Sequence, residues 1–429
     1  MTGTTPTRHV ILGNGPAGVV AAEQIRKQRP RDSIVMVGAE PEPPYSRMAI
    51  PYLLIGKVGE KGTYLRKDPD HFRKQNIQEI RARATKLDTA GKKVMLDNGD
   101  VLEYDKLLIA TGARPISPPI PGVNLPGVHP CWTLENARQI IELAKPGSRV
   151  LQMGAGFIGC IIMEALAARG VKLSVVEMGD RMVPRMMGPV AGGMIRDWCE
   201  AKGVQVFTGT KVEAITQGAG AEKGLLGKLA AAVGLSSDDA SGALLVRLSN
   251  GQTVEADLVI SATGVRPAIG FLKDSGITCL QGVLTDEHLQ TNVPGIYAAG
   301  DCAEAFDLVS QKTIVSAIQP NAAEQARVAA LNMLGQNTEL KGVTQINVLD
   351  TLGLISTSFG NWEGVAGGQS AVLTDKAAGR HLSLQFKDDV MVGCNSVGWT
   401  DHVGVMRGLV EGQVHLGDWK DRLLHDPTK

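Results

Sequence analysis

The chain has 429 residues, which is too long for one ordinary core and indicates two or three domains. Hydrophobic residues make up 43 %, and Lys plus Arg equals Asp plus Glu at 44 each, which argues against the basic excess of a nucleic-acid binder. The 51 glycines and 4 % aromatic residues favour an α/β protein with many tight turns. The N-terminus leads into a predicted strand without a signal peptide, and no apolar run approaches the ~20 residues of a membrane span. We therefore expect a soluble, cytoplasmic protein.

One pattern of elements occurs twice, in residues 8–40 and 148–180. Each copy has an apolar run, the motif G-x-G-x-x-G, a helical stretch and a second apolar run that ends near an acid. This pattern predicts a βαβ unit whose glycines permit the tight turn, the approach of a pyrophosphate and the packing of helix on strand. The turn residues predicted to bind are Gly13, Gly15, Pro16, Ala17 and Gly18 in the first copy, and Gly154, Gly156, Phe157, Ile158 and Gly159 in the second.

The acids that follow the second strands indicate which nucleotide each copy prefers. Glu177 closes the strand VKLSVVE, where a carboxylate accepts bonds from ribose hydroxyls and repels a 2′-phosphate. The second site is therefore expected to take NAD(H) rather than NADP(H), with a solvated strand-end glutamate as the alternative. Glu40 is the ribose ligand expected in the first copy.

Small-residue turns follow two further buried strands, in YDKLLIATGARP and ADLVISATGVRP. They contain Ala110, Thr111 and Gly112 in the first and Ala262, Thr263 and Gly264 in the second. Such turns let the chain pass beside a bound cofactor and cross between domains. In TNVPGIYAAGDCAE, a strand is predicted to end at Gly300, with Asp301 at the head of the next helix, where an ordinary N-cap is the alternative role.

The order of these motifs over roughly residues 8–330 resembles the pyridine nucleotide–disulfide oxidoreductase superfamily, the flavoprotein reductases with two dinucleotide folds. The resemblance implies an α/β fold with two three-layer, Rossmann-like dinucleotide-binding domains and a smaller α+β C-terminal domain. It implies an FAD-binding domain at 1–116 and 266–333, an NAD-binding domain at 117–265 and an interface domain at 334–429.

The resemblance also implies roles for single residues. The first glycine-rich turn would hold FAD and the second NAD(H), with Gly264 near the nicotinamide. Further FAD contacts are implied for residues in several separate segments: Arg47, Ala84, Ala110, Thr111, Gly112, Gly300, Asp301 and Asn321. No residue is assigned to acid–base catalysis, because the flavin carries the hydride chemistry, and no metal site is expected.

The segment PEPPYSRMAIPYLLIGK, residues 41–57, resembles the ferredoxin, rubredoxin, putidaredoxin and nitrite reductase branch. Met48 occupies the position of the redox cysteine in thiol-based relatives, and a thioether forms neither a thiolate nor a reversible sulfenate. The six cysteines show no metal-ligand spacing. Tyr52 and Ile161 replace a Lys and a Glu that the branch often carries beside the flavin, which leaves the rate and the flavin potential open.

The sequence thus predicts an NADH-dependent flavoprotein reductase that exchanges electrons with an iron–sulfur or rubredoxin-type protein, free or as a subunit of a larger enzyme such as an aldehyde oxidoreductase. The alternatives are an NADH oxidase or CoA-persulfide reductase, and a non-catalytic, NAD(H)-responsive flavoprotein scaffold. In the tail, strands are predicted in 345–360 and 381–398, followed by a helical stretch over 401–412. Residues 218–242 are interpreted as an insertion whose apolar helical face packs on its own domain, with docking to a protein partner or a membrane surface as the alternative. Trp399 is interpreted as part of ordinary core and surface packing, with a position facing the flavin or a partner as the alternative.

Overall fold

The computed structural model describes residues 6–218, 243–343 and 346–429, and the predicted insertion 218–242 lies almost wholly outside them. The chain divides into two compact units, each described by itself below. Unit 1 comprises 1–49, 58–114 and 265–345, and unit 2 comprises 50–57, 115–264 and 346–429. The finer, three-domain division remains a prediction. None of the helices in the described ranges combines the length and apolarity needed to cross a membrane.

Unit 1 is built on a parallel five-stranded sheet of order β19-β7-β1-β2-β3. Its strands are β1 (Arg8–Leu12), β2 (Ser33–Gly38), β3 (Ile77–Arg81), β7 (Lys106–Ile109) and β19 (Ile296–Ala298). Helices of this unit are α1 (Pro16–Gln28), α3 (His71–Lys74) and α8 (Gln319–Met333), with short 3-10 turns η1 (Arg47–Ala49), η2 (Glu60–Thr63) and η4 (Gly270–Leu272). Smaller sheets contain β4 (Ala84–Asp88), β5 (Lys93–Leu96) and β6 (Val101–Glu103); β8 (Ala113–Pro115) and β17 (Val265–Pro267); and β18 (Val283–Leu284), β20 (Ala303–Phe306) and β21 (Thr313–Val315).

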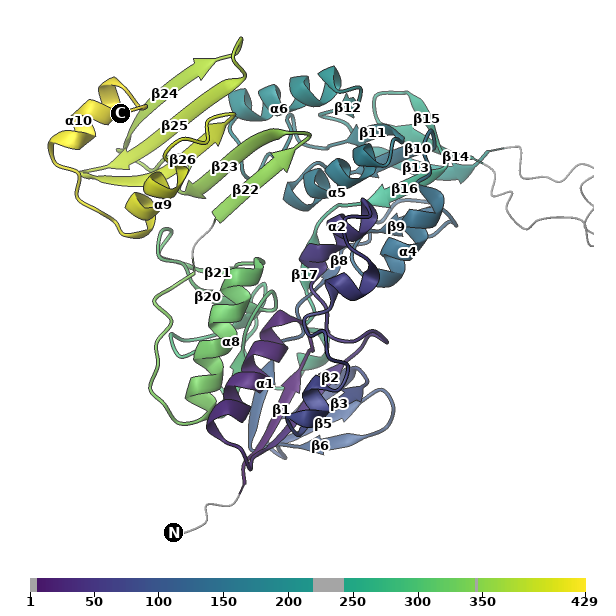
Figure 1. The fold of residues 1–429 in the computed structure, drawn as a ribbon, viewed down its shortest axis with the longest axis vertical. Helices are drawn as coiled ribbons and strands as arrows, with labels where there is room; N and C mark the ends of the chain where they lie inside the picture. The colour runs from purple at the N-terminus through teal and green to yellow at the C-terminus, as the bar shows by residue number, and fades with distance from the viewer. Residues whose placement is uncertain (1–5, 219–242, 344–345) are drawn as a thin grey trace, which may run out of the picture. The chain divides into compact units, whose positions relative to one another are not determined.

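The alternation of side chains along β1 explains why this unit has three layers. Ile11 belongs to the cluster formed with α1 and α8, which lie side by side in Figure 1, whereas Val10 and Leu12 belong to the cluster formed with the β4–β5–β6 meander. Successive residues of a strand face opposite sides, so apolar residues at each position bury the sheet on both faces. The helix layer and the meander layer thus sandwich the parallel sheet.

Unit 2 repeats this plan with a parallel sheet of order β12-β11-β10-β16-β9. Its elements are β9 (Val128–Pro130), β10 (Arg149–Met153), β11 (Lys172–Val176), β12 (Gln205–Phe207), β16 (Leu258–Ser261), the meander β13 (Val212–Gln217), β14 (Leu244–Leu248) and β15 (Thr253–Ala256), and the helices α2 (Ile50–Leu54), α4 (Leu134–Leu143), α5 (Phe157–Ala168) and α6 (Pro189–Ala201). Leu151 and Met153 of β10 face the meander. Both βαβ units predicted from the glycine motifs are therefore present.

The C-terminal part of unit 2 is an antiparallel sheet of order β22-β23-β26-β25-β24. Its elements are β22 (Ile346–Thr351), β23 (Leu354–Gly360), β24 (Gln369–Asp375), β25 (Arg380–Lys387), β26 (Val390–Val397), α9 (Val403–Glu411) and α10 (Asp418–His425). The strands and the closing helix predicted in this region are confirmed, while β24 and α10 were not predicted. The sheet packs on α5 and α6 of the same unit.

Candidate dinucleotide-binding sites

The first glycine-rich turn joins β1 to α1. Gly13 has φ +115°, and a Cβ there would lie 2.0 Å from the carbonyl oxygen of Ala110. A Cβ on Gly18 would lie 1.9 Å from the carbonyl oxygen of Gly13, whereas one on Gly15 would meet nothing within 4 Å. The protein's own packing therefore requires the first and third glycines, and the second leaves open space at the helix N-terminus. Such a space suits an anion, because the first helical N–H groups have no intrahelical partner.

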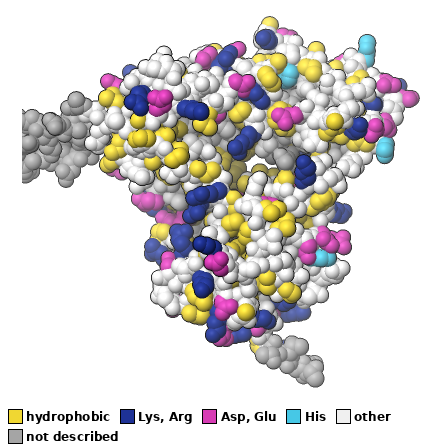
Figure 2. Space-filling view, turned by 180° about the vertical axis from the view of Figure 1, so that it is seen from behind, with side chains coloured by type: hydrophobic (Ala, Val, Ile, Leu, Met, Phe, Trp, Pro, Cys, Tyr) yellow, Lys and Arg dark blue, Asp and Glu magenta, His cyan; other side chains and the backbone are white. Residues whose placement is uncertain are grey.

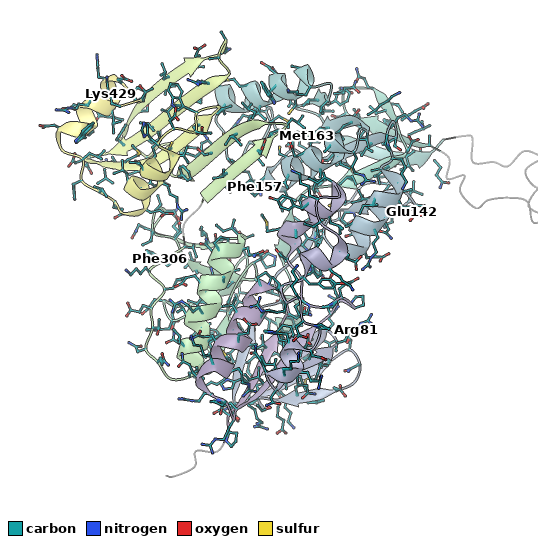
Figure 3. The ribbon with its side chains drawn as sticks, in the orientation of Figure 1. Arg81, Glu142, Phe157, Met163, Phe306 and Lys429 are labelled. Atoms are coloured by element: carbon teal, nitrogen blue, oxygen red, sulfur yellow. The ribbon has the colours of Figure 1, made fainter. Side chains whose placement is uncertain are left out.

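The second turn joins β10 to α5 and has the same features. Gly154 has φ +98°, and a Cβ there would lie 2.4 Å from the carbonyl oxygen of Ala262. A Cβ on Gly159 would lie 2.5 Å from the carbonyl oxygen of Gly154, and one on Gly156 would meet nothing within 4 Å. Phe157 begins α5, as Figure 3 shows, and Ile158 follows it in the first turn. The two repeats therefore form equivalent open helix N-termini.

The turns after β7 and β16 run beside the glycine-rich turns. Ala110 donates its N–H to Leu12 O over 2.8 Å, which places this segment against the first turn. The Thr111 hydroxyl donates to Ala268 O over 3.0 Å, and Gly112 has φ +65°. In unit 2, the Thr263 hydroxyl donates to Ile116 O over 3.1 Å, and Gly264 has φ +109°. The hydroxyl of each threonine thus holds its turn against the backbone of another segment.

Glu40 and Arg47, which the sequence suggested as separate cofactor contacts, are brought together with Tyr45. The Tyr45 hydroxyl donates to Glu40 Oε2 over 2.6 Å, and Arg47 donates to Glu40 Oε1 over 2.5 Å. Arg47 also donates to the Tyr45 hydroxyl over 2.7 Å, with its guanidinium 5.3 Å from the ring centroid. These contacts order the strand-end carboxylate, so a ribose at Glu40 would share this acceptor with Arg47 and Tyr45.

Asp301 follows β19, but the expected helix after it is wrong. Residues 301 and 302 form a turn that leads into β20, because a strand beginning at Ala303 pairs with β18 and β21. Burial raises the pKa of the Asp301 carboxyl above its ordinary range, and the positive charge of Arg47 opposes this shift. Asp301 is therefore a half-buried acid, and Arg47 lies close enough for its charge to act on the carboxyl.

Helix α8 holds the turn that carries Asp301. Gly300 has φ +81° and donates its N–H to Oε1 of the fully buried Gln325 over 2.7 Å. Asn321 in the first turns of α8 donates to the Ser316 hydroxyl over 2.6 Å. Ala84 lies elsewhere in unit 1, at the start of β4, where it pairs with Leu96.

Glu177 lies immediately after β11, next to the second glycine-rich turn. Its Oε2 accepts from the Ala155 N–H over 2.7 Å, and its Oε1 accepts from the Gly179 N–H over 2.7 Å. The carboxylate is thus positioned by backbone of the turn itself. The next side chain, Met178, is 68 % exposed and offers no charge to a ribose phosphate.

The residues that distinguish this chain within its predicted branch are partly exposed or take part in structural contacts. Met48 is 54 % exposed and Tyr52 is 53 % exposed. Glu164, the glutamate nearest to Ile161 in the sequence of α5, accepts a hydrogen bond from the backbone N–H of Leu352, which gives it a structural role. Trp399 is half-buried, with the Arg380 guanidinium 5.4 Å from its ring centroid.

Burial raises the pKa of all six cysteine thiols, which are free. For Cys131, Cys199 and Cys394 the pKa reaches about 12. Since the thiolate is the reactive form, none of these thiols is prepared for nucleophilic or redox chemistry.

Three residues of these sites were not singled out from the sequence: Tyr45, Gln325 and Gln152. Gln152 could have been noticed in the sequence, because it is a polar residue between the apolar residues Leu151 and Met153, just before Gly154. Tyr45 bonds to Glu40 within an irregular segment, and Gln325 bonds to Gly300, which is distant in the chain. No regular spacing in the sequence indicates either pair.

Comparison with known proteins identifies the class to which these sites belong. A family model described as pyridine nucleotide-disulphide oxidoreductase matches residues 7–329. The chain therefore belongs to the pyridine nucleotide–disulphide oxidoreductase family. It is an NADH-dependent flavoprotein oxidoreductase with FAD and NAD(H) as cofactors.

Relatives within this class differ in the activity that their names give. The chain is 29 % identical over 424 residues to the epsilon subunit of NADH-dependent phenylglyoxylate dehydrogenase of Aromatoleum evansii, covering 98 % of this chain and 95 % of that one. It is 30 % identical to an NADH oxidase of Methanocaldococcus jannaschii, covering 91 % and 87 %. It is 29 % identical to rhodocoxin reductase of Rhodococcus erythropolis, covering 78 % and 74 %.

A solved structure with the same fold is the NAD-dependent persulfide reductase from A. fulgidus. It is 27 % identical, with a TM-score of 0.84, and the match covers 96 % of this chain and 78 % of that one. The two-domain dinucleotide fold is thus shared by members that act on different acceptors.

Proposed function

We propose that this chain transfers electrons between NAD(H) and a one-electron iron–sulfur or rubredoxin-type protein by way of FAD. It would act as a free reductase or as the flavin subunit of a larger enzyme. The proposed FAD contacts lie in unit 1: Gly13, Gly15, Pro16, Ala17, Gly18, Glu40, Arg47, Ala84, Ala110, Thr111, Gly112, Gly300, Asp301 and Asn321. The proposed NAD(H) contacts lie in unit 2: Gly154, Gly156, Phe157, Ile158, Gly159, Glu177 and Gly264.

The observation that carries the proposal is the state of the thiols. Disulfide and persulfide chemistry needs a thiolate beside the flavin. By the resemblance, Met48 would take that position, and burial raises the pKa of every cysteine thiol. Reducing equivalents from NADH would therefore leave the flavin directly rather than through a protein thiol. FAD, when bound, accepts a hydride and releases electrons one at a time, which suits an iron–sulfur partner.

The chain's own residues would bind and orient the two cofactors. The N–H groups at the starts of α1 and α5 would receive the two pyrophosphates, with Gly15 and Gly156 leaving room for them. Glu40 and Glu177 would accept bonds from ribose hydroxyls, and each is already positioned by protein donors. Asp301 is held close to Arg47, whose charge favours the ionised form of its carboxyl.

Two relatives support the choice of acceptor. The epsilon subunit of phenylglyoxylate dehydrogenase is by name a component of a larger NADH-dependent enzyme, and it matches nearly the whole chain. Rhodocoxin reductase is by name the reductase of rhodocoxin. In a subunit role, the electrons would flow from the partner toward NAD⁺.

An anaerobic titration and a comparison of acceptors test this function. NADH should bleach the oxidised flavin absorbance of the FAD-loaded protein, and a [2Fe–2S] ferredoxin should then reoxidise it much faster than oxygen or CoA persulfide does. Faster turnover with oxygen or persulfide would favour the oxidase or persulfide reductase alternatives. Failure of NADH to bleach the flavin would contradict the proposed function and favour the scaffold alternative.

A further inference from the structure

Gln152 is a fully buried amide in the strand that leads into the second glycine-rich turn. Its neighbours Leu151 and Met153 face the β13–β14–β15 meander, so Gln152 faces the opposite side of the sheet, where α5 begins. Its Nε2 donates to the carbonyl oxygen of Gly154 over 2.8 Å and to that of Gly159 over 2.9 Å. One side chain therefore ties together the first and third glycines of the motif.

The stability of the fold does not by itself explain why an amide occupies this position. Its Oε1 is buried and accepts no hydrogen bond from any residue that the structure describes, and a buried unpaired acceptor destabilises a fold. The first repeat has an apolar residue at the equivalent place, since Ile11 lies in the buried core two residues before Gly13. A buried unpaired acceptor, at a place where the other repeat has an apolar residue, points to a role of this amide in the site.

The two repeats differ in geometry where the amide lies. A Cβ on Gly18 would come within 1.9 Å of the Gly13 carbonyl oxygen, whereas the equivalent distance from Gly159 to the Gly154 oxygen is 2.5 Å. The same Cβ on Gly159 would lie 3.1 Å from Nε2 of Gln152. The helix thus begins slightly farther from the turn in the second repeat, where the amide bridges the two carbonyls.

The amide also connects to the expected ribose ligand. The peptide between Gly154 and Ala155 is planar and trans, so fixing its carbonyl on one side directs its N–H to the other. That N–H donates to Oε2 of Glu177 over 2.7 Å. A continuous chain of bonds therefore runs from the Gln152 amide through one peptide group to the Glu177 carboxylate.

We propose that Gln152 is a positioning residue for NAD(H): its amide fixes the Gly154–Ala155 peptide and the start of α5, and thereby orients both the pyrophosphate-binding turn and Glu177. The inference rests on the proposed assignment of the second turn to NAD(H). It predicts a role in nucleotide affinity and in the choice between NADH and NADPH, but not in FAD binding.

The test uses Gln152→Met, which keeps the length of the side chain, and Gln152→Ile, which copies the first repeat. Asn332→Leu is the matched control, because it removes another nearly buried amide. This amide belongs to α8 of unit 1 and donates to Val328 O and to Thr338 O. For each FAD-loaded variant, we would measure the thermal midpoint, the FAD content, the Kd of NAD⁺ by calorimetry, and kcat and KM with NADH and NADPH.

Both Gln152 variants should bind NAD⁺ about tenfold more weakly, with full FAD content, a kcat within about twofold of wild type and a smaller preference for NADH over NADPH. Asn332→Leu should lower the thermal midpoint without changing the Kd of NAD⁺. A Kd within twofold of wild type in both Gln152 variants, or an equal weakening in Asn332→Leu, would overturn the inference. Absence of NAD⁺ binding by the wild type would instead overturn the assignment of the second turn.

Discussion

The three glycines of each motif serve different purposes at the scale of single residues. Gly18 is confined by the carbonyl of Gly13, whereas Gly15 faces open space and has φ −74°, which any residue adopts. Gly15 is therefore not required by the fold of the turn itself. Its small size matters only for what binds at the helix N-terminus.

This difference predicts opposite outcomes for two alanine substitutions. Gly18→Ala should destabilise the protein by about 1–3 kcal/mol through overpacking. Gly15→Ala should change stability by less than about 1 kcal/mol but weaken FAD binding at least tenfold, because its methyl group occupies the open space. Thermal unfolding and the FAD content of purified protein would measure both effects. Normal FAD content in a folded Gly15→Ala variant would contradict the placement of the pyrophosphate.

The pair Glu177 and Met178 determines the expected choice of nicotinamide cofactor. With the proposed NAD(H) at this turn, the Glu177 carboxylate would repel a 2′-phosphate, and a cation in place of the exposed Met178 would attract one. The double variant Glu177→Ala, Met178→Arg should lower kcat/KM for NADH by about tenfold or more and raise it for NADPH. Steady-state kinetics with both nucleotides would measure this reversal.

The control for this change is Glu142→Ala, which removes an exposed carboxylate from α4, labelled in Figure 3. It should leave both kcat/KM values unaltered. If the double variant kept the wild-type preference while the protein still used NADH, Glu177 would have no role in recognising the ribose.

At the scale of elements, α5 connects the second glycine-rich turn to the C-terminal sheet. Leu352, in the turn between β22 and β23, has φ +53°, which is unfavourable for a leucine. Its N–H is bound by the Glu164 carboxylate of α5, and its carbonyl oxygen accepts from Trp198 Nε1 of α6 over 3.1 Å. Two helices of the dinucleotide fold therefore hold this turn in its strained conformation.

Removal of either contact should loosen the attachment of the sheet. Glu164→Gln and Trp198→Phe should each increase hydrogen exchange of the backbone at 346–360 about tenfold, since a strained turn relaxes when its partners are lost. Exchange measured by mass spectrometry would show the effect, with peptides from α1 in unit 1 as the internal reference. Unchanged exchange in both variants would show that apolar packing alone holds the sheet.

At the scale of the whole molecule, the internal repeat extends beyond the two βαβ units. Arg8 at the start of β1 binds Glu103 and Asp105, and Arg149 at the start of β10 binds Glu255 and Asp257. Each unit also adds a three-stranded meander before its next parallel strand. Acidic and basic side chains are interspersed over both parts of the chain in Figure 2, in keeping with the equal numbers of the two charges.

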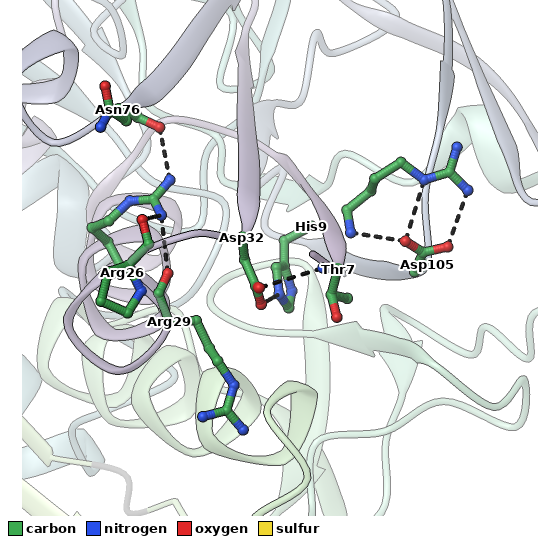
Figure 4. A network of polar contacts seen from close by, with 9 residues as sticks. Thr7, His9, Arg26, Arg29, Asp32, Asn76 and Asp105 are labelled. Carbon is green, nitrogen blue, oxygen red and sulfur yellow. Dashed lines mark hydrogen bonds and ion pairs between the residues drawn. The ribbon is translucent and has the colours of Figure 1, made fainter. Parts of the chain in front are cut away.

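Three partly or fully buried histidines make the stability of the whole molecule depend on pH. Burial lowers the pKa of His9, His129 and His381 below the ordinary value of about 6.5. For His9, which lies against Asp32 in Figure 4 with Nε2 and Oδ2 2.9 Å apart, the carboxylate opposes this shift without cancelling it. The unfolded chain therefore binds protons at a higher pH than the native protein does.

Below about pH 6.5 the unfolded chain binds protons that the native protein does not, so the free energy of unfolding should fall as the pH decreases. Above about pH 6.5 these histidines should not affect the free energy of unfolding. Each histidine contributes at most about 1.4 kcal/mol per pH unit. Urea unfolding at pH 7.5 and 5.5 would measure the change. His9→Gln and His381→Gln should each reduce it, whereas His415→Gln, at a side chain that is 83 % exposed, should not. If all three variants reduced the pH-dependent change in the free energy of unfolding equally, the change would come from other groups.

The sequence alone determined the features that depend on neighbours in the chain. Two G-x-G-x-x-G turns, each between an apolar run and a helical stretch, predicted both βαβ units, because strand and helix periodicity and the tight turn are local properties. The same local patterns predicted strands β22, β23, β25 and β26 and the helix α9. The identity of Met48 and the lack of paired cysteine motifs likewise needed no structure.

Only the tertiary structure decided which distant residues meet and what each side chain already binds. It joined Glu40 to Tyr45 and Arg47, bound Gly300 to Gln325 of α8, and gave Glu164 a partner in the C-terminal sheet. It also replaced the helix expected after Asp301 by a strand, because pairing with β18 and β21 outweighs local preference. Hydrogen bonds and pKa shifts of this kind depend on burial and on contacts between residues far apart in the chain, which no local pattern specifies.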